Sequence, residues 1–286
     1  MKADYIILGH SSHVNGVTFS KDGSKLYSFG FSGELKVWNS SDWSHLQDLN
    51  GHSKSVNGLL ELENSLMSGA LDGKLNVYEK ESGKLIKTYE DHKKGINGLK
   101  LSDDEQFILS YGEKRMAVLR NAEGEILNEL KADARHQSVK VISPDNSYIL
   151  IAGVGNKIRK FSLPDFDLLK EMEIGQVAIN RVIETKNQLW ILDYSGEVFQ
   201  VDAQSWELKK QYRLNRKGVM GMCYAPTRNE LAITADKAVI ILDAESLEEK
   251  QLLTSEAKGN YGLSWSPDEK TLALASADKR IRIWEL

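Results

Sequence analysis

The tetrapeptide Leu35-Lys36-Val37-Trp38 returns near the end of the chain as Ile281-Arg282-Ile283-Trp284. Both copies alternate apolar and basic residues before a tryptophan, which is typical of a half-buried β-strand. Five further copies lie between them and end at Tyr78, Leu119, Phe161, Val201 and Leu242. The seven final residues follow one another at steps of 40, 41, 42, 40, 41 and 42 residues. This spacing predicts a repeat that runs through the whole chain.

A second recurring segment keeps the same register. Val14-Asn15-Gly16 returns as Val56-Asn57-Gly58 and Ile96-Asn97-Gly98, with weaker copies that start at Val139, Ile179, Val219 and Asn260. The second segment precedes the first by 24, 22, 23, 22, 22, 23 and 24 residues. Two separate features therefore indicate seven repeats in one domain over 1–286. We expect approximate repeats at 9–50, 51–90, 91–131, 132–173, 174–214, 215–254 and 255–286, with 1–8 added to the last.

Each repeat has room for four short strands and no long helix. In the first repeat, strands are expected at Val14–Ser20, Lys25–Phe29, Glu34–Asn39 and Leu46–Leu49, with Lys21-Asp22-Gly23 as a turn. Apolar and aromatic runs bounded by Gly, Asp, Asn and Ser are the signal for strands and turns. The sequence therefore predicts an all-β fold of repeated four-stranded units.

Composition limits the classes of function. The 37 basic and 41 acidic residues give a net charge of −4, which lacks the basic excess of a nucleic-acid-binding protein. Cys223 is the single cysteine, so neither an intrachain disulfide nor a multi-cysteine zinc site is possible. No stretch reaches the roughly 20 apolar residues of a membrane helix. We expect a soluble intracellular protein, placed in the cytoplasm with the nucleus left open, that does not bind membranes.

The repeat resembles the WD40 family, whose period is about 40–45 residues with a Gly-His … Trp-Asp signature. Gly9-His10 and Gly51-His52 match the Gly-His pair, and Asp91-His92 matches with the glycine replaced. Trp38 and Trp284 match the tryptophan, although Asn39 and Glu285 replace the aspartate. The resemblance covers the whole chain and is strongest in repeats 1, 2 and 7. It implies a seven-bladed β-propeller with four antiparallel strands in each blade.

In the WD40 family, a His, a Ser or Thr, an Asp and a Trp of one blade form a buried chain of hydrogen bonds. The resemblance assigns His52, Ser68, Asp72 and Tyr78 to this structural network in repeat 2. Repeat 1 supplies His10, Ser28 and Trp38, with Ser32 where the aspartate is expected. Repeats 4 and 5 lack the set, so we expect apolar packing to hold those blades.

The last repeat ends at Leu286, directly after its third strand. Ile7-Leu8-Gly9-His10 aligns with Leu49-Asn50-Gly51-His52, where a fourth strand leads into the next repeat. We therefore expect Asp4–Leu8 to complete the last blade and close the ring, which removes an exposed sheet edge.

A search for catalytic chemistry returns structural interpretations. Neither a Gly-x-Ser-x-Gly elbow nor a phosphate-binding loop nor a His-Glu-x-x-His motif is present. His10 and His13 lie three residues apart at a strand start without a nearby acid or thiol, so we expect neither a metal nor a cofactor. The basic stretch 209–217 is read as an exposed outer strand, with binding of an acidic peptide or phosphate as the alternative. Trp43 and Trp206 are expected to be exposed in outer-strand loops.

The family places the residue after the second segment's Val or Ile at the mouth of the central channel, on the top face. Asparagine recurs at this place and offers donors and acceptors without charge. An equally favoured interpretation is that asparagine suits the start of the strand. The candidate partner-binding residues, with His13 from just before the segment, are His13, Asn15, Asn57, Asn97, Lys140, Asn180, Met220 and Tyr261.

These observations favour a non-catalytic scaffold that binds a peptide or protein partner on the top face. One alternative is an architectural subunit that uses its side or bottom surfaces. A less favoured alternative is a propeller that binds a small ligand or carries an active site, because fold alone does not fix function. The partner and the oligomeric state are left open by the sequence.

Overall fold

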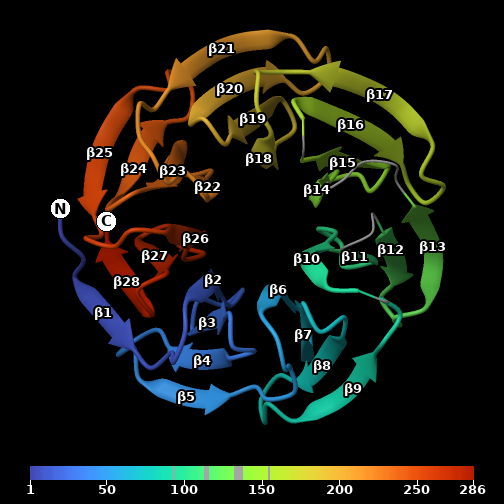
Figure 1. The fold of residues 1–286 in the computed structure, drawn as a ribbon, viewed down its shortest axis with the longest axis vertical. Helices are drawn as coiled ribbons and strands as arrows, with labels where there is room; N and C mark the ends of the chain where they lie inside the picture. The colour runs from blue at the N-terminus through green and yellow to red at the C-terminus, as the bar shows by residue number, and fades with distance from the viewer. Residues whose placement is uncertain (93, 113–115, 132–137, 154) are drawn as a thin grey trace. The chain divides into compact units, whose positions relative to one another are not determined.

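The computed structural model describes residues 1–92, 94–112, 116–131, 138–153 and 155–286. It contains seven sheets of four antiparallel strands, and in six of them the strands follow one another in chain order. Figure 1 shows the sheets following one another along the colour gradient, with the blue N-terminal strand beside the red strands of the last sheet. The fold is an all-β, seven-bladed propeller, as the repeat predicted. The sheets are called blades 1 to 7 below.

The chain divides into two compact units, of which the first comprises 1–89 and 216–286. This unit holds blades 1, 2, 6 and 7. Blade 1 consists of β2 (Val14–Phe19), β3 (Lys25–Gly30), β4 (Leu35–Asn39) and β5 (His45–Asp48). Blade 2 consists of β6 (Val56–Glu61), β7 (Ser65–Ala70), β8 (Leu75–Glu79) and β9 (Leu85–Tyr89). Blade 6 consists of β22 (Met222–Ala225), β23 (Glu230–Ala235), β24 (Ala238–Asp243) and β25 (Glu249–Thr254). Blade 7 consists of β26 (Asn260–Trp265), β27 (Thr271–Ser276), β28 (Arg280–Glu285) and β1 (Tyr5–Leu8).

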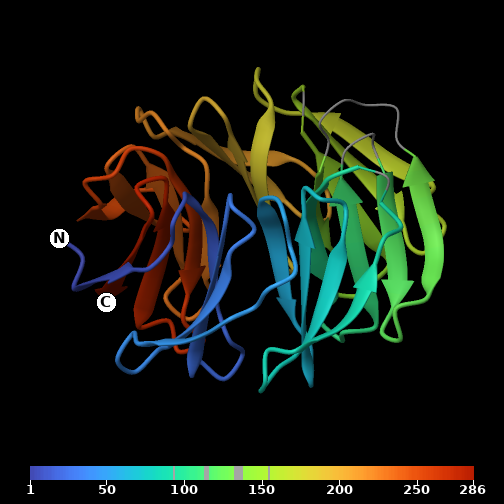
Figure 2. The same cartoon turned by 60° about the horizontal axis from the view of Figure 1, so that its bottom comes forward.

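The second unit comprises 90–215 and holds blades 3 to 5. Blade 3 consists of β10 (Ile96–Leu101), β11 (Phe107–Gly112), β12 (Met116–Asn121) and β13 (Ile126–Lys131). Blade 4 consists of β14 (Ser138–Ile142), β15 (Tyr148–Ala152), β16 (Lys157–Ser162) and β17 (Leu168–Glu173). Blade 5 consists of β18 (Ile179–Glu184), β19 (Gln188–Asp193), β20 (Glu197–Asp202) and β21 (Leu208–Arg213). The strands of single blades are seen from a second direction in Figure 2.

The second and third strands supply most of the core, although β16 of blade 4 has only one buried residue, Ile158. In blade 6, every residue of β23 and the first five residues of β24 are buried, because both faces of the sheet are covered. The fourth strands are mostly exposed, as in β9 and β17. This gradient explains the near-continuous apolar runs of the middle strands and the polar outer strands.

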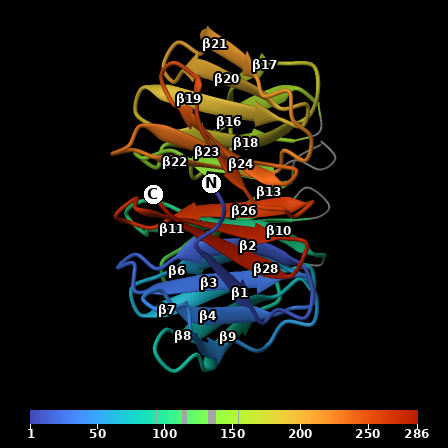
Figure 3. The same ribbon diagram turned by 90° about the vertical axis from the view of Figure 1, so that its left-hand side faces the viewer.

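Blade 7 joins the two ends of the described sequence. β1 pairs with β28 in antiparallel register, with Tyr5 opposite Ile283 and Ile7 opposite Ile281. Ile7 is buried in a cluster that includes Ile281 and Ile283. Figure 3 shows β1 running beside β28. The prediction that the N-terminal strand completes the last blade is confirmed.

Trp43 and Trp206 are packed rather than exposed, which corrects the expectation from sequence. Both occupy the turn before a fourth strand and have a positive φ, of 61° and 66°. Trp206 is 8% exposed and belongs to an apolar cluster of blades 4 and 5, while Trp43 packs partly buried against a cluster of blades 1 and 7. A left-handed backbone is costly for a large residue, and we infer that the buried ring offsets that cost.

Candidate functional site

Blade 1 contains a buried chain of hydrogen bonds. His10 Nε2 lies 2.6 Å from Ser28 Oγ, and Trp38 Nε1 donates to the same oxygen at 2.7 Å. Because the indole can only donate, the serine hydroxyl is free to donate to His10 Nε2, which leaves the Nδ1 hydrogen for an acceptor. Burial lowers the pKa of His10, so the imidazole is neutral.

The acceptor in blade 1 is Glu34, which sequence reasoning missed. Its carboxylate lies 3.2 Å from His10 Nδ1 and accepts from the backbone N–H of Ser11 at 3.1 Å. Ser32, which stands where the aspartate was expected, donates to Glu34 at 3.1 Å. The longer side chain of Glu34, two residues after Ser32, therefore replaces the missing aspartate as the hydrogen-bond acceptor of His10.

Blade 2 holds the equivalent set with the expected aspartate. His52 Nε2 lies 2.7 Å from Ser68 Oγ, and its Nδ1 lies 3.1 Å from Asp72 Oδ2. The Asp72 carboxylate also accepts from the backbone N–H groups of Ser53 at 2.9 Å and Lys74 at 3.0 Å. Tyr78, hydrogen-bonded to Ser68, takes the place of the tryptophan.

Blade 3 departs from this pattern at the aromatic position. His92 Nε2 lies 2.8 Å from Ser110 Oγ. Strand register places Ile108 opposite Arg120, as Leu26 lies opposite Trp38 in blade 1, so the signature position is Arg120 and not Leu119. The fully buried Arg120 forms an ion pair with Asp91. Burial and the positive charge of Arg120 lower the pKa of His92 to about 4.

The exchange of tryptophan for arginine explains a second departure from the signature. Gly9 has a φ of 149°, and a Cβ built there would lie 2.8 Å from the Trp38 ring. The large ring therefore requires glycine before the histidine of blade 1. In blade 3, where no aromatic ring fills that space, Asp91 replaces the glycine and pairs with Arg120. Positions 91 and 120 thus differ together from the family pattern.

Five candidate partner-binding residues share a local backbone feature. The pairing of the first two strands shifts register, which leaves one unpaired residue in a β-bulge. Bulges re-aim side chains, so one sequence position does not fix one orientation. The residues skipped in this way are Asn15, Asn57, Asn97, Lys140 and Asn180.

In the first unit, the bulge asparagines tie two blades together. Asn15 Nδ2 donates to the backbone oxygen of Val56 at 3.1 Å and to Asn57 Oδ1 at 2.8 Å. Ser55 donates to the same Asn57 oxygen at 3.0 Å. These contacts favour the interpretation that the two asparagines suit the structure, since their polar groups are already engaged.

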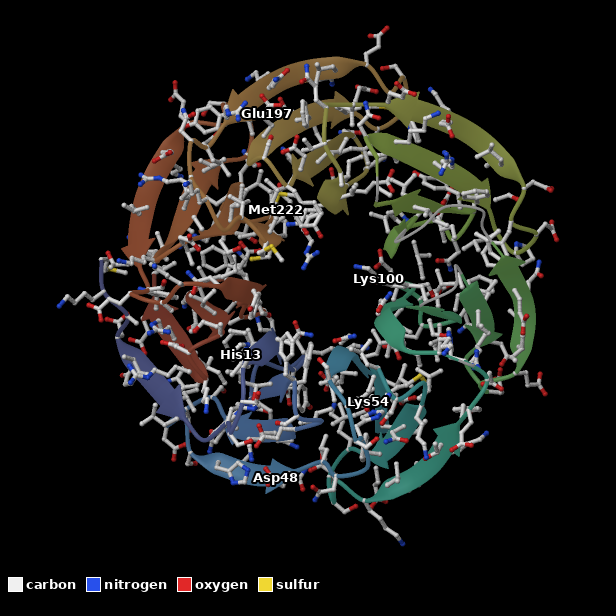
Figure 4. All side chains as sticks on the ribbon, in the orientation of Figure 1. His13, Asp48, Lys54, Lys100, Glu197 and Met222 are labelled. Carbon is white, nitrogen blue, oxygen red and sulfur yellow. The ribbon has the colours of Figure 1, made fainter. Side chains whose placement is uncertain are left out.

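Beside them lies an aromatic cluster of His13, Phe31 and Tyr261. The ring centroids are 5.3 Å apart for His13 and Phe31, 6.1 Å for Phe31 and Tyr261, and 6.5 Å for His13 and Tyr261. Phe31 is 47% exposed, and its backbone N–H donates to the His13 carbonyl at 3.0 Å. Figure 4 labels His13 at the start of β2. Sequence reasoning selected two members but missed Phe31.

The remaining candidates differ in exposure. Met220 lies half-buried ahead of β22, and its backbone N–H donates to Thr234 Oγ1 at 3.0 Å. Asn97 is exposed, whereas Asn180 is only 1% exposed and accepts from Arg181 Nη1 at 2.9 Å. Asn180 is therefore not a surface residue, contrary to expectation. The side chain of Lys140 lies outside the described residues.

Away from these residues, a cavity of about 630 Å³ opens in blades 4 and 5. Met172, Ile174, Phe199 and Trp206 supply apolar walls. Glu197, labelled in Figure 4, lines the cavity and lies 3.7 Å from Arg213, while Gln211 donates to it at 3.0 Å. The outer strand β21, which carries part of the basic stretch, thus forms one wall.

Two absences concern only the described part of the chain. Within it, no group of three or more His, Cys, Asp or Glu side chains is arranged to hold a metal ion. No helix among the described residues is long and apolar enough to cross a membrane.

Comparison with curated proteins finds partial matches. The component SWD3 of COMPASS from Saccharomyces cerevisiae is 25% identical over 116 residues, which cover 37% of each chain. Subunit I of eukaryotic translation initiation factor 3 from Neurospora crassa is 25% identical over 117 residues, or 40% of this chain and 33% of that protein. The matches thus span about a third of the curated relatives.

A solved structure matches over nearly the full length. The WD40 β-propeller domain of Doa1 superposes with a TM-score of 0.86 and 18% identity, covering 98% of this chain and 95% of that one. The family model described as WD domain, G-beta repeat, matches residues 2–39, 83–118 and 253–285. With the seven four-stranded blades and the His–Ser–aromatic chains, these matches show a seven-bladed β-propeller that carries WD40 repeats at residues 2–39, 83–118 and 253–285.

Proposed function

We propose that the chain is a non-catalytic scaffold whose aromatic cluster, His13, Phe31 and Tyr261, binds a peptide or protein partner. WD40 propellers generally mediate protein interactions, and the relatives above include a COMPASS component and an initiation-factor subunit. The observation that supports this site is the exposed Phe31 ring, which packs against the rings of both His13 and Tyr261. Exposed aromatic groups of this kind supply much of the energy of protein interfaces.

The remaining candidate residues take different parts in this proposal. Met220 offers an adaptable apolar contact beside the cluster. Asn15 and Asn57 support the surface by holding blades 1 and 2 together. Asn97 is exposed in the second unit and, like Lys140, stays a prediction.

The test is a quantitative affinity purification from the native cells, followed by titration of the purified partner. The double variant Phe31→Ala/Tyr261→Ala is expected to weaken binding at least 30-fold, because hot-spot aromatics contribute about 2 kcal/mol or more each. Tyr194→Ala is the matched control, since Tyr194 is an exposed aromatic residue of blade 5. Unchanged affinity in a double variant with an unchanged melting temperature would contradict the site.

The cavity in blades 4 and 5 favours a second candidate function, an architectural subunit that binds its neighbours by a side surface. Leu208 lines the cavity and is half-exposed. If this function holds, Leu208→Asp abolishes assembly with the partner, whereas Phe31→Ala/Tyr261→Ala does not. The opposite result assigns the partner to the aromatic cluster.

A further inference from the structure

Two basic side chains gather on the first strands of the second unit. Lys100 belongs to β10 and Arg181 to β18, and the strand between them, β14, packs against both. Figure 4 places Lys100 at this edge, between β10 and β14. The two side chains come from blades 3 and 5, and the positive charge of Arg181 contributes to lowering the pKa of the Lys100 amine.

The partly buried Tyr111 completes the group. Tyr111 of β11 lies opposite Gly98, and a Cβ built at Gly98 would fall 2.2 Å from the Tyr111 hydroxyl. The phenol therefore lies across β10 through the space that glycine leaves, two residues before Lys100. Burial raises the pKa of the Tyr111 hydroxyl, and the positive charge of Arg181 opposes this shift without cancelling it. The phenol therefore keeps its hydrogen at neutral pH.

Nothing among the described side chains balances these charges. Arg181 Nη1 donates to the backbone oxygen and the Oδ1 of Asn180, at 3.1 and 2.9 Å, and both acceptors are neutral. No described carboxylate pairs with Lys100 or Arg181, and burial together with Arg181 lowers the pKa of Lys100 to about 8. Burying the Lys100 amine near the positive charge of Arg181 costs free energy that a bound anion would recover.

We propose that Lys100, Arg181 and Tyr111 form a binding site for an oxyanion, a phosphoryl or carboxylate group. The ammonium supplies a compact charge, the exposed guanidinium supplies paired N–H donors, and the phenol donates one hydrogen bond. This site is separate from the aromatic cluster of the proposed function. Its ligand has two possible sources, a free small anion and the phosphorylated side chain of a partner.

Calorimetric titration of the whole protein with inorganic phosphate and with capped phosphoserine amide tests the site and separates the two sources. Lys100→Met and Arg181→Gln are each expected to weaken binding by roughly ten- to a hundredfold, because each removes charge-assisted hydrogen bonds. Lys84→Met is the matched control, since Lys84 is exposed in a turn of blade 2 and should bind as the unaltered chain does.

Thermal unfolding without added anion gives a second readout. Lys100→Met is expected to raise Tm, because it removes one of two facing positive charges, and to abolish the rise in Tm that phosphate causes. Binding of neither probe, or binding that survives both substitutions, overturns the proposal. A lowered Tm in Lys100→Met without added anion also overturns it, because the lysine would then have a stabilising partner within the protein.

Discussion

Blades 1 and 3 both contain a hydrogen-bonded His–Ser pair, but they differ in the residue at the tryptophan position of the signature. In blade 1 the pair continues to Trp38, which is fully packed and donates a single hydrogen bond. In blade 3 it is followed by Arg120, which is equally buried but holds its charge against Asp91. The comparison teaches that this position requires volume first, and that its polar chemistry can change if a second residue changes with it.

Removing the side chain at the signature position should give the largest effect. Trp38→Ala is expected to lower the free energy of unfolding by about 3–5 kcal/mol, through lost burial and a new cavity. Arg120→Met keeps most of the volume and leaves the partly exposed Asp91 to water, so its expected cost is below about 1.5 kcal/mol. Urea unfolding measures both. Equal losses would mean that the ion pair, and not volume, holds blade 3.

The second largest effect is expected from lowering the pH, which should destabilise blade 3 through His92. The pKa of His92 is lowered from an ordinary 6.5 to about 4 in the folded protein, so the unfolded chain takes up the proton more readily. The stabilisation that the neutral His92 gives to the folded state is therefore complete above pH 6.5 and is lost as the pH falls toward 4. The loss is on the order of 2–3 kcal/mol. His10 and His52 act in the same direction, through burial. Arg120→Met should raise the pKa of His92 and reduce the loss between pH 7 and 4.5, which unfolding at both values measures. An unchanged loss would show that Arg120 does not act on His92.

The next prediction concerns Gly9, which precedes the histidine of blade 1 and is replaced by Asp91 in blade 3. Gly9→Ala is expected to cost about 1–3 kcal/mol, since the new Cβ meets the Trp38 ring and the backbone φ of 149° is unfavourable. Gly155→Ala is the control, because Gly155 has a φ of 87° and open space around its Cβ position. The difference in Tm between the two variants isolates the contact with Trp38. Equal shifts would assign the whole effect to the backbone.

Replacing the acid that accepts a hydrogen bond from the histidine should have the smallest effect on the free energy of unfolding. Glu34→Gln weakens the carboxylate's contacts with His10, Ser11 and Ser32 and is expected to lower the free energy of unfolding by about 1 kcal/mol. Asp72→Asn in blade 2 should cost more, because Asp72 also accepts from two backbone N–H groups and is more buried. Chemical denaturation of the pair gives the order. A larger loss in Glu34→Gln would contradict the equivalence of the two acids.

Much of the fold was predictable because each blade repeats one physical problem. Most of the sheets bury their middle strands, so apolar runs recur with the period of the blade. The N-terminal strand β1 could be assigned to blade 7 by alignment with the start of blade 2. In blade 3 the predicted position of the aromatic residue was wrong by one residue. An apolar pattern ends at Leu119, and only strand pairing shows that the charged Arg120 fills the aromatic position.

The candidate site was less predictable because it depends on neighbours that are distant in sequence. Phe31 lies in a turn, and only the packing of blades 1 and 7 brings Tyr261 beside it. Asn97 and Asn180 share one place in the repeat, yet one is exposed and the other buried. Their bulges aim the two side chains differently, and sequence does not encode that choice locally.

The pairing of β1 with β28 has a consequence for the order of events in the cell. β1 leaves the ribosome before all the other strands of the seven blades, and its partner β28 leaves after them. Contacts between such distant segments form slowly, because the closure entropy of the intervening chain is lost before any pairing is gained. Until then β28 presents an open strand edge that other chains can occupy. Blade 7 is therefore joined only after the strands of all the other blades have been synthesised, and the interval before it is the period of greatest exposure to misassembly.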